Sequence, residues 1–142
     1  MKAITVRQPW AWAIIHAGKD VENRTRNIAG DYRGPLAIHS SGRKSDDPQY
    51  VAQALEHRIF AMLDAQMLAN LRTGWGLLHG CVLGAVDLTD VHRYPFCLDA
   101  DGAHCSWWAD QVDGIHHLEL EDARPLRLPL QIPGHLGLWE LP

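Results

Sequence analysis

Apolar positions alternate or recur with helical spacing along the first part of the chain and predict four elements. The apolar, β-prone run 3–6 predicts a strand, and Pro9 after it suits the first turn of a helix. Trp10 and Ile14 recur at helical spacing, and we expect this helix to end at Gly18, which offers a left-handed cap. Residues 20–25 predict a charged strand, and residues 36–39 alternate as a third strand.

The rest of the chain predicts one long helix and three strands. Pro48 starts a helix that we expect to run to about Arg72, because apolar residues recur at helical spacing between them. Residues 81–91 predict a long apolar strand in which Gly84 marks a bend, as in a curved sheet. Residues 93–114 are irregular, and residues 115–120 and 136–141 predict the last two strands. The order β-α-β-β-α-β-β-β has too little helix for a doubly wound parallel sheet and is compatible with an α+β barrel.

Length and composition describe a globular chain. The 142 residues correspond to one domain, 1–142, and 46% hydrophobic with 21% charged residues exclude a disordered, collagen-like or coiled-coil protein. No apolar run is long enough to span a bilayer, and none forms the core of a signal peptide. We therefore expect a cytoplasmic protein with no membrane partner.

Metal ligands and cofactor motifs are not recognisable. Three cysteines cannot all pair within one chain, and they lack a zinc-binding spacing, which predicts reduced thiols. Cys97, His104 and Cys105 share one irregular segment, and of His116 and His117 only one can face inward on a strand. No Walker, Rossmann or G-x-S-x-G motif is present. We expect neither a metal site nor a cofactor.

Charge is distributed unevenly, although the net charge is only −4. Residues 1–44 hold eight basic and three acidic residues, a net charge of +5, and the rest of the chain carries −9. A basic segment on an acidic protein can form a local anion-binding face. The alternative is that these basic residues are scattered over several faces.

Six short motifs follow one another along the chain. They are Gln8-Pro9-Trp10-Ala11, Gly18-Lys19, Glu22-Asn23-Arg24 and the runs 33–39 (RGPLAIH), 80–88 (GCVLGAVDL) and 137–139 (GLW). With this order and spacing, from Thr5 to Leu141, the chain resembles the ASCH domain family. The resemblance implies a PUA-like fold, a small and mostly antiparallel β-barrel with flanking helices. It also implies a superfamily associated with RNA and modified nucleotides, although a fold by itself does not settle a function.

The resemblance implies either catalysis or binding. A compact branch of the family hydrolyses N4-acetylcytidine with a lysine, a threonine three positions later and a glutamate further along the chain. Lys19 matches the lysine, whereas Glu22 stands in the place of the threonine and no glutamate aligns with the third residue. Other members resemble ribonucleases or nucleic-acid binders, and the QPW motif is similar to that of a binding module at the end of a eukaryotic transcription coactivator. Binding is the function that the resemblance favours.

Lys19, Glu22 and Arg24 are the first candidates for a site. On an extended strand Glu22, Arg24 and Arg26 point to one face, and Lys19 precedes them at the end of the helix. The basic side chains suit a phosphate, and Glu22 can accept a hydrogen bond from the exocyclic amine of a base. The alternative is a structural salt bridge from Glu22 to Arg24 or Arg26. In an enzyme Lys19 and Glu22 would be catalytic, with Lys19 stabilising an oxyanion and Glu22 orienting water or taking a proton.

Gln8, Trp10 and the loop 39–43 complete the candidate site. Trp10 either stacks on a base or anchors the helix in the core, and Gln8 offers its amide to a base edge. His39, Ser41 and Arg43 belong to a small polar loop that can hold a phosphate through main-chain donors, or is simply solvated. His39 is also a candidate general acid or base.

Three functional hypotheses remain open. The first is a domain that binds nucleic acid in a cleft, with RNA or a modified nucleoside or nucleotide as the main partner and DNA as a further one. The second is a small hydrolase, either an N4-acetylcytidine amidohydrolase or a ribonuclease. The third is a protein-interaction module that kept the fold and lost the ligand, in which side chains of the protein itself would fill the cleft. The sequence indicates no oligomeric state.

Overall fold

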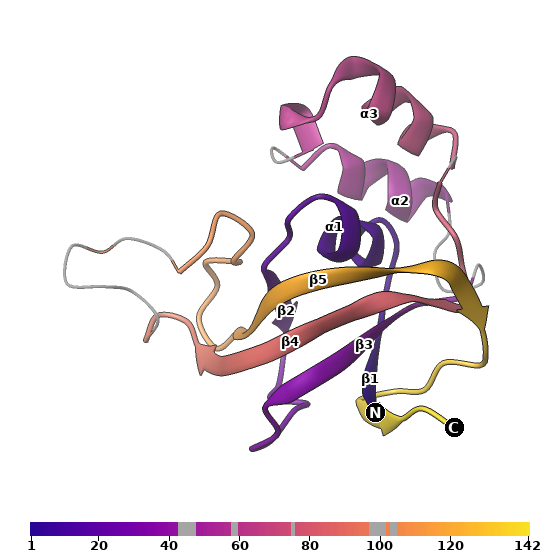
Figure 1. Ribbon diagram of the computed structural model, residues 1–142. Coiled ribbons are helices and arrows are strands. Elements are labelled where there is room, and N and C mark those ends of the chain that lie inside the picture. Colours follow the sequence, from indigo (N-terminus) through magenta and orange to yellow (C-terminus); the bar gives the residue numbers. More distant parts are fainter. Residues whose placement is uncertain (43–47, 58–59, 75, 97–101, 103–104) are drawn as a thin grey trace.

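The computed structural model describes residues 1–42, 48–57, 60–74, 76–96, 102 and 105–142 (Figure 1). Most strands come from the two ends of the chain, and α2 and α3 come from its middle. The elements in chain order are β1 (Lys2–Val6), α1 (Trp10–His16), β2 (Val21–Arg24), β3 (Gly34–Ser40), α2 (Pro48–Leu55), the 3₁₀ helix η1 (Phe60–Met62), α3 (Ala65–Arg72), β4 (Cys81–Arg93), β5 (His116–Gln131) and β6 (Leu138–Glu140).

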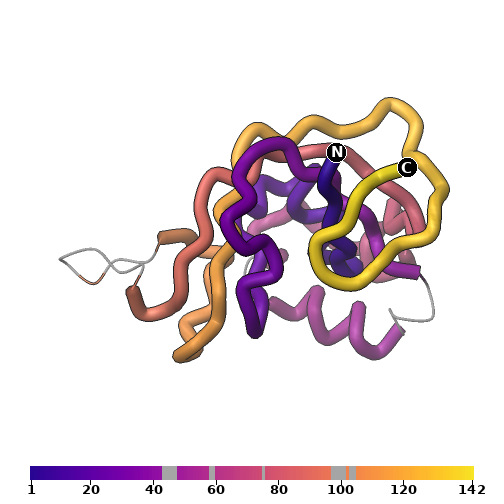
Figure 2. Tube along the Cα trace, turned by 90° about the horizontal axis from the view of Figure 1, so that it is seen from below, coloured from indigo at the N-terminus to yellow at the C-terminus, as the bar shows by residue number. Residues whose placement is uncertain are grey.

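The strands of the described residues form one curled sheet in the order β2-β5-β4-β3-β1-β6. β1 and β3 are parallel, and the other neighbours are antiparallel. Because β6 pairs with β1, the two ends of the chain lie side by side (Figures 1 and 2). The sheet and its helices confirm the predicted α+β class and the PUA-like fold, in the form of a half-barrel.

α1 lies between the sheet and the other helices (Figure 1). Ile14 packs in the main core with strand residues such as Ile4, and Trp12 packs in a second core with Leu55 of α2 and Phe60 of η1. The short helix is therefore buried on two sides. This explains why its sequence, WAWAIIH, is apolar almost all round.

The sheet carries its predicted irregularity at Gly84. A Cβ at this position would lie 2.5 Å from the main-chain oxygen of Arg124 on β5 and 3.0 Å from Cδ1 of Ile15 on α1. The register between β4 and β5 also shifts between Val82 and Gly84. Glycine is required here because β4, β5 and α1 approach one another too closely for any side chain.

The predicted helix between Pro48 and Arg72 is wrong as a single element, because the chain there forms α2, η1 and α3. Asp64 accepts a hydrogen bond from the main-chain N–H of Met67 at 2.8 Å and so begins α3 as an N-cap. The break places apolar side chains of both helices, Leu55 and Leu71, in the same core. Helical spacing of apolar residues continued across the break and concealed it.

Two strand boundaries also differ from the prediction. β5 continues from residue 120 to Gln131, and the outer part of this strand pairs with β4 while its side chains stay exposed. Leu126, Leu128 and Leu130 do alternate along this part although all three are exposed, so the prediction ended the strand too early. β6 spans three residues instead of the predicted six.

Within the described ranges, no helix combines the length and apolar character that spanning a membrane would need. A cytoplasmic location stays a prediction.

Candidate functional site

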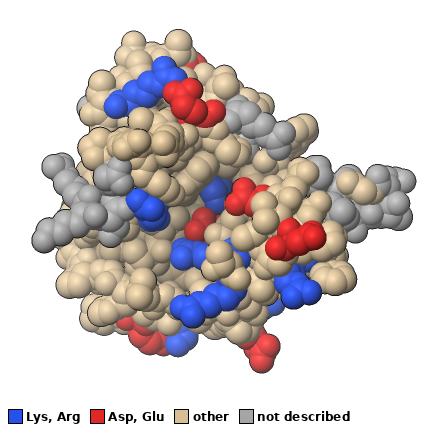
Figure 3. Space-filling view, turned by 180° about the vertical axis from the view of Figure 1, so that it is seen from behind, with Lys and Arg blue, Asp and Glu red and all other residues tan. Residues whose placement is uncertain are grey.

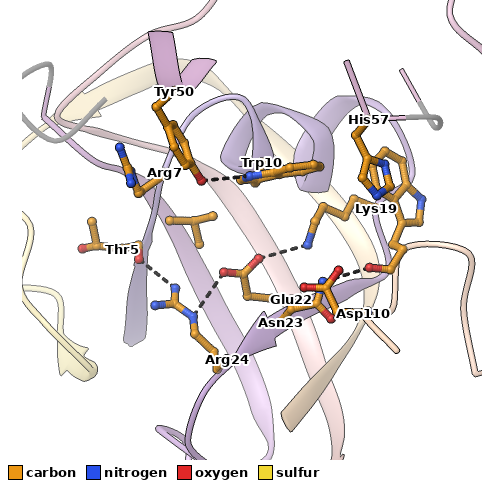
Figure 4. Close-up of a pocket in the computed structure, with 12 residues that line it drawn as sticks. Thr5, Arg7, Trp10, Lys19, Glu22, Asn23, Arg24, Tyr50, His57 and Asp110 are labelled. Carbon is orange, nitrogen blue, oxygen red and sulfur yellow. Dashed lines mark hydrogen bonds and ion pairs between the residues drawn. The ribbon is translucent and has the colours of Figure 1, made fainter. Parts of the chain in front are cut away.

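A cleft of about 320 Å³ is lined by residues of β1, α1, β2, α2 and the loop that precedes β5. Lys19, Glu22 and Arg24 lie on one side of it, and the rings of Trp10 and Tyr50 lie on the other, with Arg7 beside Tyr50 (Figure 4). Figure 3 shows basic and acidic side chains gathered in and around a hollow on the face of the molecule opposite to that of Figure 1. The lining residues are Thr5, Val6, Arg7, Trp10, Lys19, Glu22, Asn23, Arg24, Tyr50, His57, Trp108 and Asp110.

Lys19, Glu22 and Arg24 form a connected ionic trio in this cleft. Lys19 Nζ lies 3.0 Å from Glu22 Oε2, and Arg24 Nε lies 3.1 Å from Glu22 Oε1 (Figure 4). The Nε–H of Arg24 is not aimed at the carboxylate, so this second contact is an ion pair without a hydrogen bond. Lys19 and Glu22 are only 3% and 7% exposed, which makes the trio much less screened than a surface ion pair.

The end of α1 positions Lys19. Gly18 adopts a positive φ of 69°, and the main-chain N–H of Lys19 then donates to the oxygen of Ala13 at 3.1 Å. This confirms the predicted left-handed cap. The chain enters β2 directly afterwards, and Lys19 Nζ folds back to donate to the oxygen of Val21 as well as to Glu22. Two of the three ammonium donors are thus used within the protein.

Aromatic side chains lie above the ionic trio in Figure 4. Trp10 donates from Nε1 to the hydroxyl of Tyr50 at 3.1 Å, and its ring centre lies 6.5 Å from that of Trp108 in an edge-to-face arrangement. Lys19 Nζ lies 5.8 Å from the Trp10 ring, and the guanidinium of Arg7 lies 3.4 Å from the Tyr50 ring. Trp10 both packs against the two cores and lines the cleft, so the alternatives of anchor and stacking surface are compatible.

Asn23 holds the loop before β5 against the cleft. Its side-chain nitrogen donates to the oxygen of Trp108 at 2.9 Å, and its side-chain oxygen accepts from the main-chain N–H of Asp110 at 3.0 Å. These two bonds bring Trp108 and Asp110 into the cleft lining. Sequence reasoning missed both residues as site members, as it missed Arg7, Tyr50 and His57. The sequence features that could have indicated these residues were the Glu22-Asn23-Arg24 motif and the two adjacent tryptophans at 107 and 108.

The structure places Gln8 and Arg26 outside the cleft lining, which corrects the predicted cluster. Gln8 is fully buried, and its amide donates to the oxygen of Leu78 at 2.6 Å and accepts from the main-chain N–H of Trp12 at 3.0 Å. These two bonds engage both the nitrogen and the oxygen of the Gln8 side chain and fix the start of α1. β2 ends at Arg24, so Arg26 lies exposed in the bend that follows. Only Glu22 and Arg24 share the strand face as predicted.

His39 and Ser41 belong to a different pocket, lined also by Gly80 and residues 132–136. His39 is 1% exposed, its Nε2 lies 3.0 Å from the oxygen of Ile132, and burial lowers its pKa. Gly134 covers the ring so closely that a Cβ there would lie 2.4 Å from His39 Cε1. Thr5 is the one lining residue that the two pockets share. Arg43, the third predicted member of this loop, lies outside the described residues.

The basic segment at the start of the chain is divided between the cleft and other surfaces. Arg7, Lys19 and Arg24 line the cleft. Lys2 pairs with Glu140 at 3.5 Å, and Arg33 pairs with Asp90 at 3.5 Å. Together with Glu22 and Asp110, the three cleft cations leave one net positive charge in the lining. The local charge of +5 therefore overstates the positive character of the site.

Solved structures of ASCH proteins share this fold. The protein is similar to the ASCH protein from Zymomonas mobilis, with a TM-score of 0.50, 15% identity, and 99% of this chain and 87% of that chain covered. A point mutant of the Zymomonas mobilis protein matches with a TM-score of 0.54 at 14% identity and covers 99% and 89% of the two chains. No protein-family model matches the sequence. The fold of this chain is thus the ASCH fold that the sequence resemblance implied.

Proposed function

We propose that this protein, which has the ASCH fold, binds single-stranded RNA or a modified nucleoside or nucleotide in the cleft. The observation that carries the proposal is the position of the ionic trio directly beside the aromatic residues, with Lys19 Nζ 5.8 Å from the Trp10 ring. Aromatic faces bind bases of any sequence, and buried charged groups provide the directional hydrogen bonds. A volume of about 320 Å³ suits one nucleotide unit rather than a duplex.

The chemistry of the cleft divides into two parts. Glu22 and Asp110 are acceptors for the exocyclic amine of a base such as cytosine or adenine. Arg24 uses Nη2 for the oxygen of Thr5 and Nε for the ion pair with Glu22, which leaves donors on Nη1. Arg24 and Arg7 are therefore the groups that we assign to a phosphate. DNA remains a further ligand of the same chemistry, distinguished only by the 2′-hydroxyl.

Binding is tested with labelled RNA and DNA oligonucleotides of matched sequence and with free cytidine and N4-acetylcytidine. We expect salt-sensitive RNA binding that weakens at least about tenfold in Arg7→Ala and Arg24→Ala. Lys2→Ala is the matched control, because Lys2 belongs to the same basic segment but pairs with Glu140 away from the cleft. Folded Arg7→Ala and Arg24→Ala proteins that bind every ligand like the wild type would refute the assignment of the cleft.

A hydrolase is the second candidate, favoured by the buried contact between Lys19 and Glu22 with Asp110 lining the same cleft. Lys19 would stabilise a developing oxyanion, and Glu22 or Asp110 would accept a proton from water. Incubation with N4-acetylcytidine and with short RNA, followed by chromatography, tests both forms of this activity. Turnover that disappears in Glu22→Gln establishes the enzyme, and absence of turnover leaves binding. The interaction-module hypothesis is not favoured, because the side chains of the described residues leave the cleft open.

A further inference from the structure

Three side chains that can bind a soft metal ion converge behind the loop that lines the cleft. They are His92 near the end of β4, Cys105 in the loop and His117 near the start of β5. His92 and His117 face each other directly in the register of the two antiparallel strands. Their ligand atoms and the sulfur of Cys105 all lie within 4.8 Å of one another. Pairing of β4 with β5 therefore brings the two histidines together, and the loop before β5 supplies the sulfur of Cys105.

Distances in the cluster match those between ligands of one metal ion. Cys105 Sγ lies 3.3 Å from His92 Nε2 and 3.3 Å from His117 Nδ1. With metal–sulfur bonds of about 2.3 Å and metal–nitrogen bonds of about 2.0 Å, sulfur and nitrogen ligands of a tetrahedral zinc site lie about 3.5 Å apart. Both sulfur–nitrogen distances are thus close to those of a tetrahedral site, and the ligand nitrogens of the two histidines lie within 4.8 Å of each other.

The remote nitrogens of both imidazoles face acceptors, as they do in metal-binding histidines. His117 Nε2 lies 2.9 Å from the main-chain oxygen of Asp110. His92 Nδ1 lies 3.5 Å from a carboxylate oxygen of Asp90 and 3.5 Å from one of Glu119. These acceptors place the ring protons on the remote nitrogens, so that both lone pairs face Cys105.

We propose that His92, Cys105 and His117 bind one transition-metal ion of the zinc class, which fixes the loop that carries Trp108 and Asp110. Binding of the ion displaces the thiol proton of Cys105 to solvent and leaves a thiolate ligand. His117 is fully buried and also contacts the oxygen of Asp110, so it connects the ion directly to the cleft lining. Three protein ligands leave one corner of the tetrahedron for solvent or a further ligand. The proposal departs from the sequence-based expectation of no metal site.

Metal analysis of the tag-free, chelator-free protein tests this directly and independently of any RNA binding. We expect about one equivalent of zinc per chain after growth in zinc-supplemented medium. Cobalt added to the metal-stripped protein is expected to give a thiolate-to-metal charge-transfer band in the near ultraviolet. Zinc added to the metal-stripped wild type is expected to raise its melting temperature, a readout that does not depend on any variant being folded.

Matched variants separate this site from adventitious metal. Cys105→Ser and His117→Asn should lose the cobalt band or weaken zinc binding at least about tenfold, whereas Cys81→Ser and His116→Asn should retain both. Cys81 is the other cysteine of the described residues, and His116 is the neighbouring imidazole on the same strand. Metal-stripped wild type that shows neither a cobalt band nor a shift in melting temperature would overturn the proposal. So would a Cys105 thiol that alkylates rapidly whether or not zinc is present, which would indicate a thiolate–imidazolium pair instead.

Discussion

Arg24 on β2 donates a hydrogen bond from Nη2 to the main-chain oxygen of Thr5 on β1 at 2.8 Å, although three strands separate β2 from β1 in the sheet order. The sheet can bring these strands within reach of one side chain only because it curls back on itself. Arg24 therefore spans the open side of the half-barrel and also pairs with Glu22 in the cleft. The residue assigned to ligand binding is also one that holds the walls of the cleft together.

Replacement of Arg24 by lysine is expected to destabilise the protein although it preserves the charge. Lysine lacks the fork that contacts Thr5 and Glu22 at once, and loss of a charge-assisted hydrogen bond costs about 1 to 3 kcal/mol. Denaturant unfolding followed by tryptophan fluorescence measures the change. Arg26→Lys is the control, with an expected change within about 0.5 kcal/mol because Arg26 is exposed. Equal stability of the two variants would show that the bridge to Thr5 contributes nothing.

Asn23→Ala is expected to release the loop that carries Trp108 and Asp110 from the cleft. The substitution removes two hydrogen bonds to the main chain of that loop and should lower the free energy of unfolding by about 1 to 2 kcal/mol. Ligand affinity should fall more steeply than stability, because two lining residues lose their positions. Binding and unfolding are measured in parallel, with Asn70→Ala on α3, outside the cleft lining, as the control. Unchanged ligand affinity of Asn23→Ala would show that the loop carrying Trp108 and Asp110 does not contribute to binding.

Gly84→Ala is expected to be strongly destabilising without touching the cleft. The new methyl group would meet the main-chain oxygen of Arg124 at 2.5 Å, and backbone atoms of a paired strand cannot move aside as a flexible side chain can. Overpacking of this kind costs about 1 to 3 kcal/mol. Gly42→Ala, where the added Cβ meets nothing within 4 Å, should leave the melting temperature nearly unchanged. A tolerated Gly84→Ala would mean that β4 and β5 can separate at this point.

Stability is expected to decrease as the pH falls below about 6.5, and His39 should account for part of the decrease. Burial lowers the pKa of His39 below its usual 6.5, so the folded protein binds fewer protons than the unfolded chain in the window between the two values. The contribution of His39 is complete above pH 6.5 and is lost as the pH falls to the folded-state pKa. Melting temperatures of wild type and His39→Gln are compared at pH 7.5 and 5.0.

The variant should show a smaller difference between the two pH values than the wild type does. His79→Gln is the control for the loss of one histidine, because His79 lies just before β4 and is only half-buried. A pH dependence of His39→Gln that equals that of the wild type would assign the effect to other groups, such as His117, whose pKa burial also lowers.

Local signals in the sequence determined much of this protein. Gly18, Glu22 and Arg24 act where the pattern placed them, because a helix cap and the alternation of a strand depend on residues close together in the chain. Gly84 was recognisable for a similar reason, as a glycine interrupting an otherwise apolar strand. The ordered motifs indicated the ASCH fold, which the solved structures bear out.

Only the tertiary structure decided which residues share a site. It set Gln8 inside the protein and His39 in a separate pocket, because their side chains find main-chain partners at Leu78 and Ile132, far away in sequence. It brought Trp108 and Asp110 to Asn23 across more than 80 residues, and Cys105 to two histidines that strand pairing sets opposite each other. Contacts of this kind depend on strand order and sheet curvature, and no local pattern of apolar and polar residues encodes either one directly.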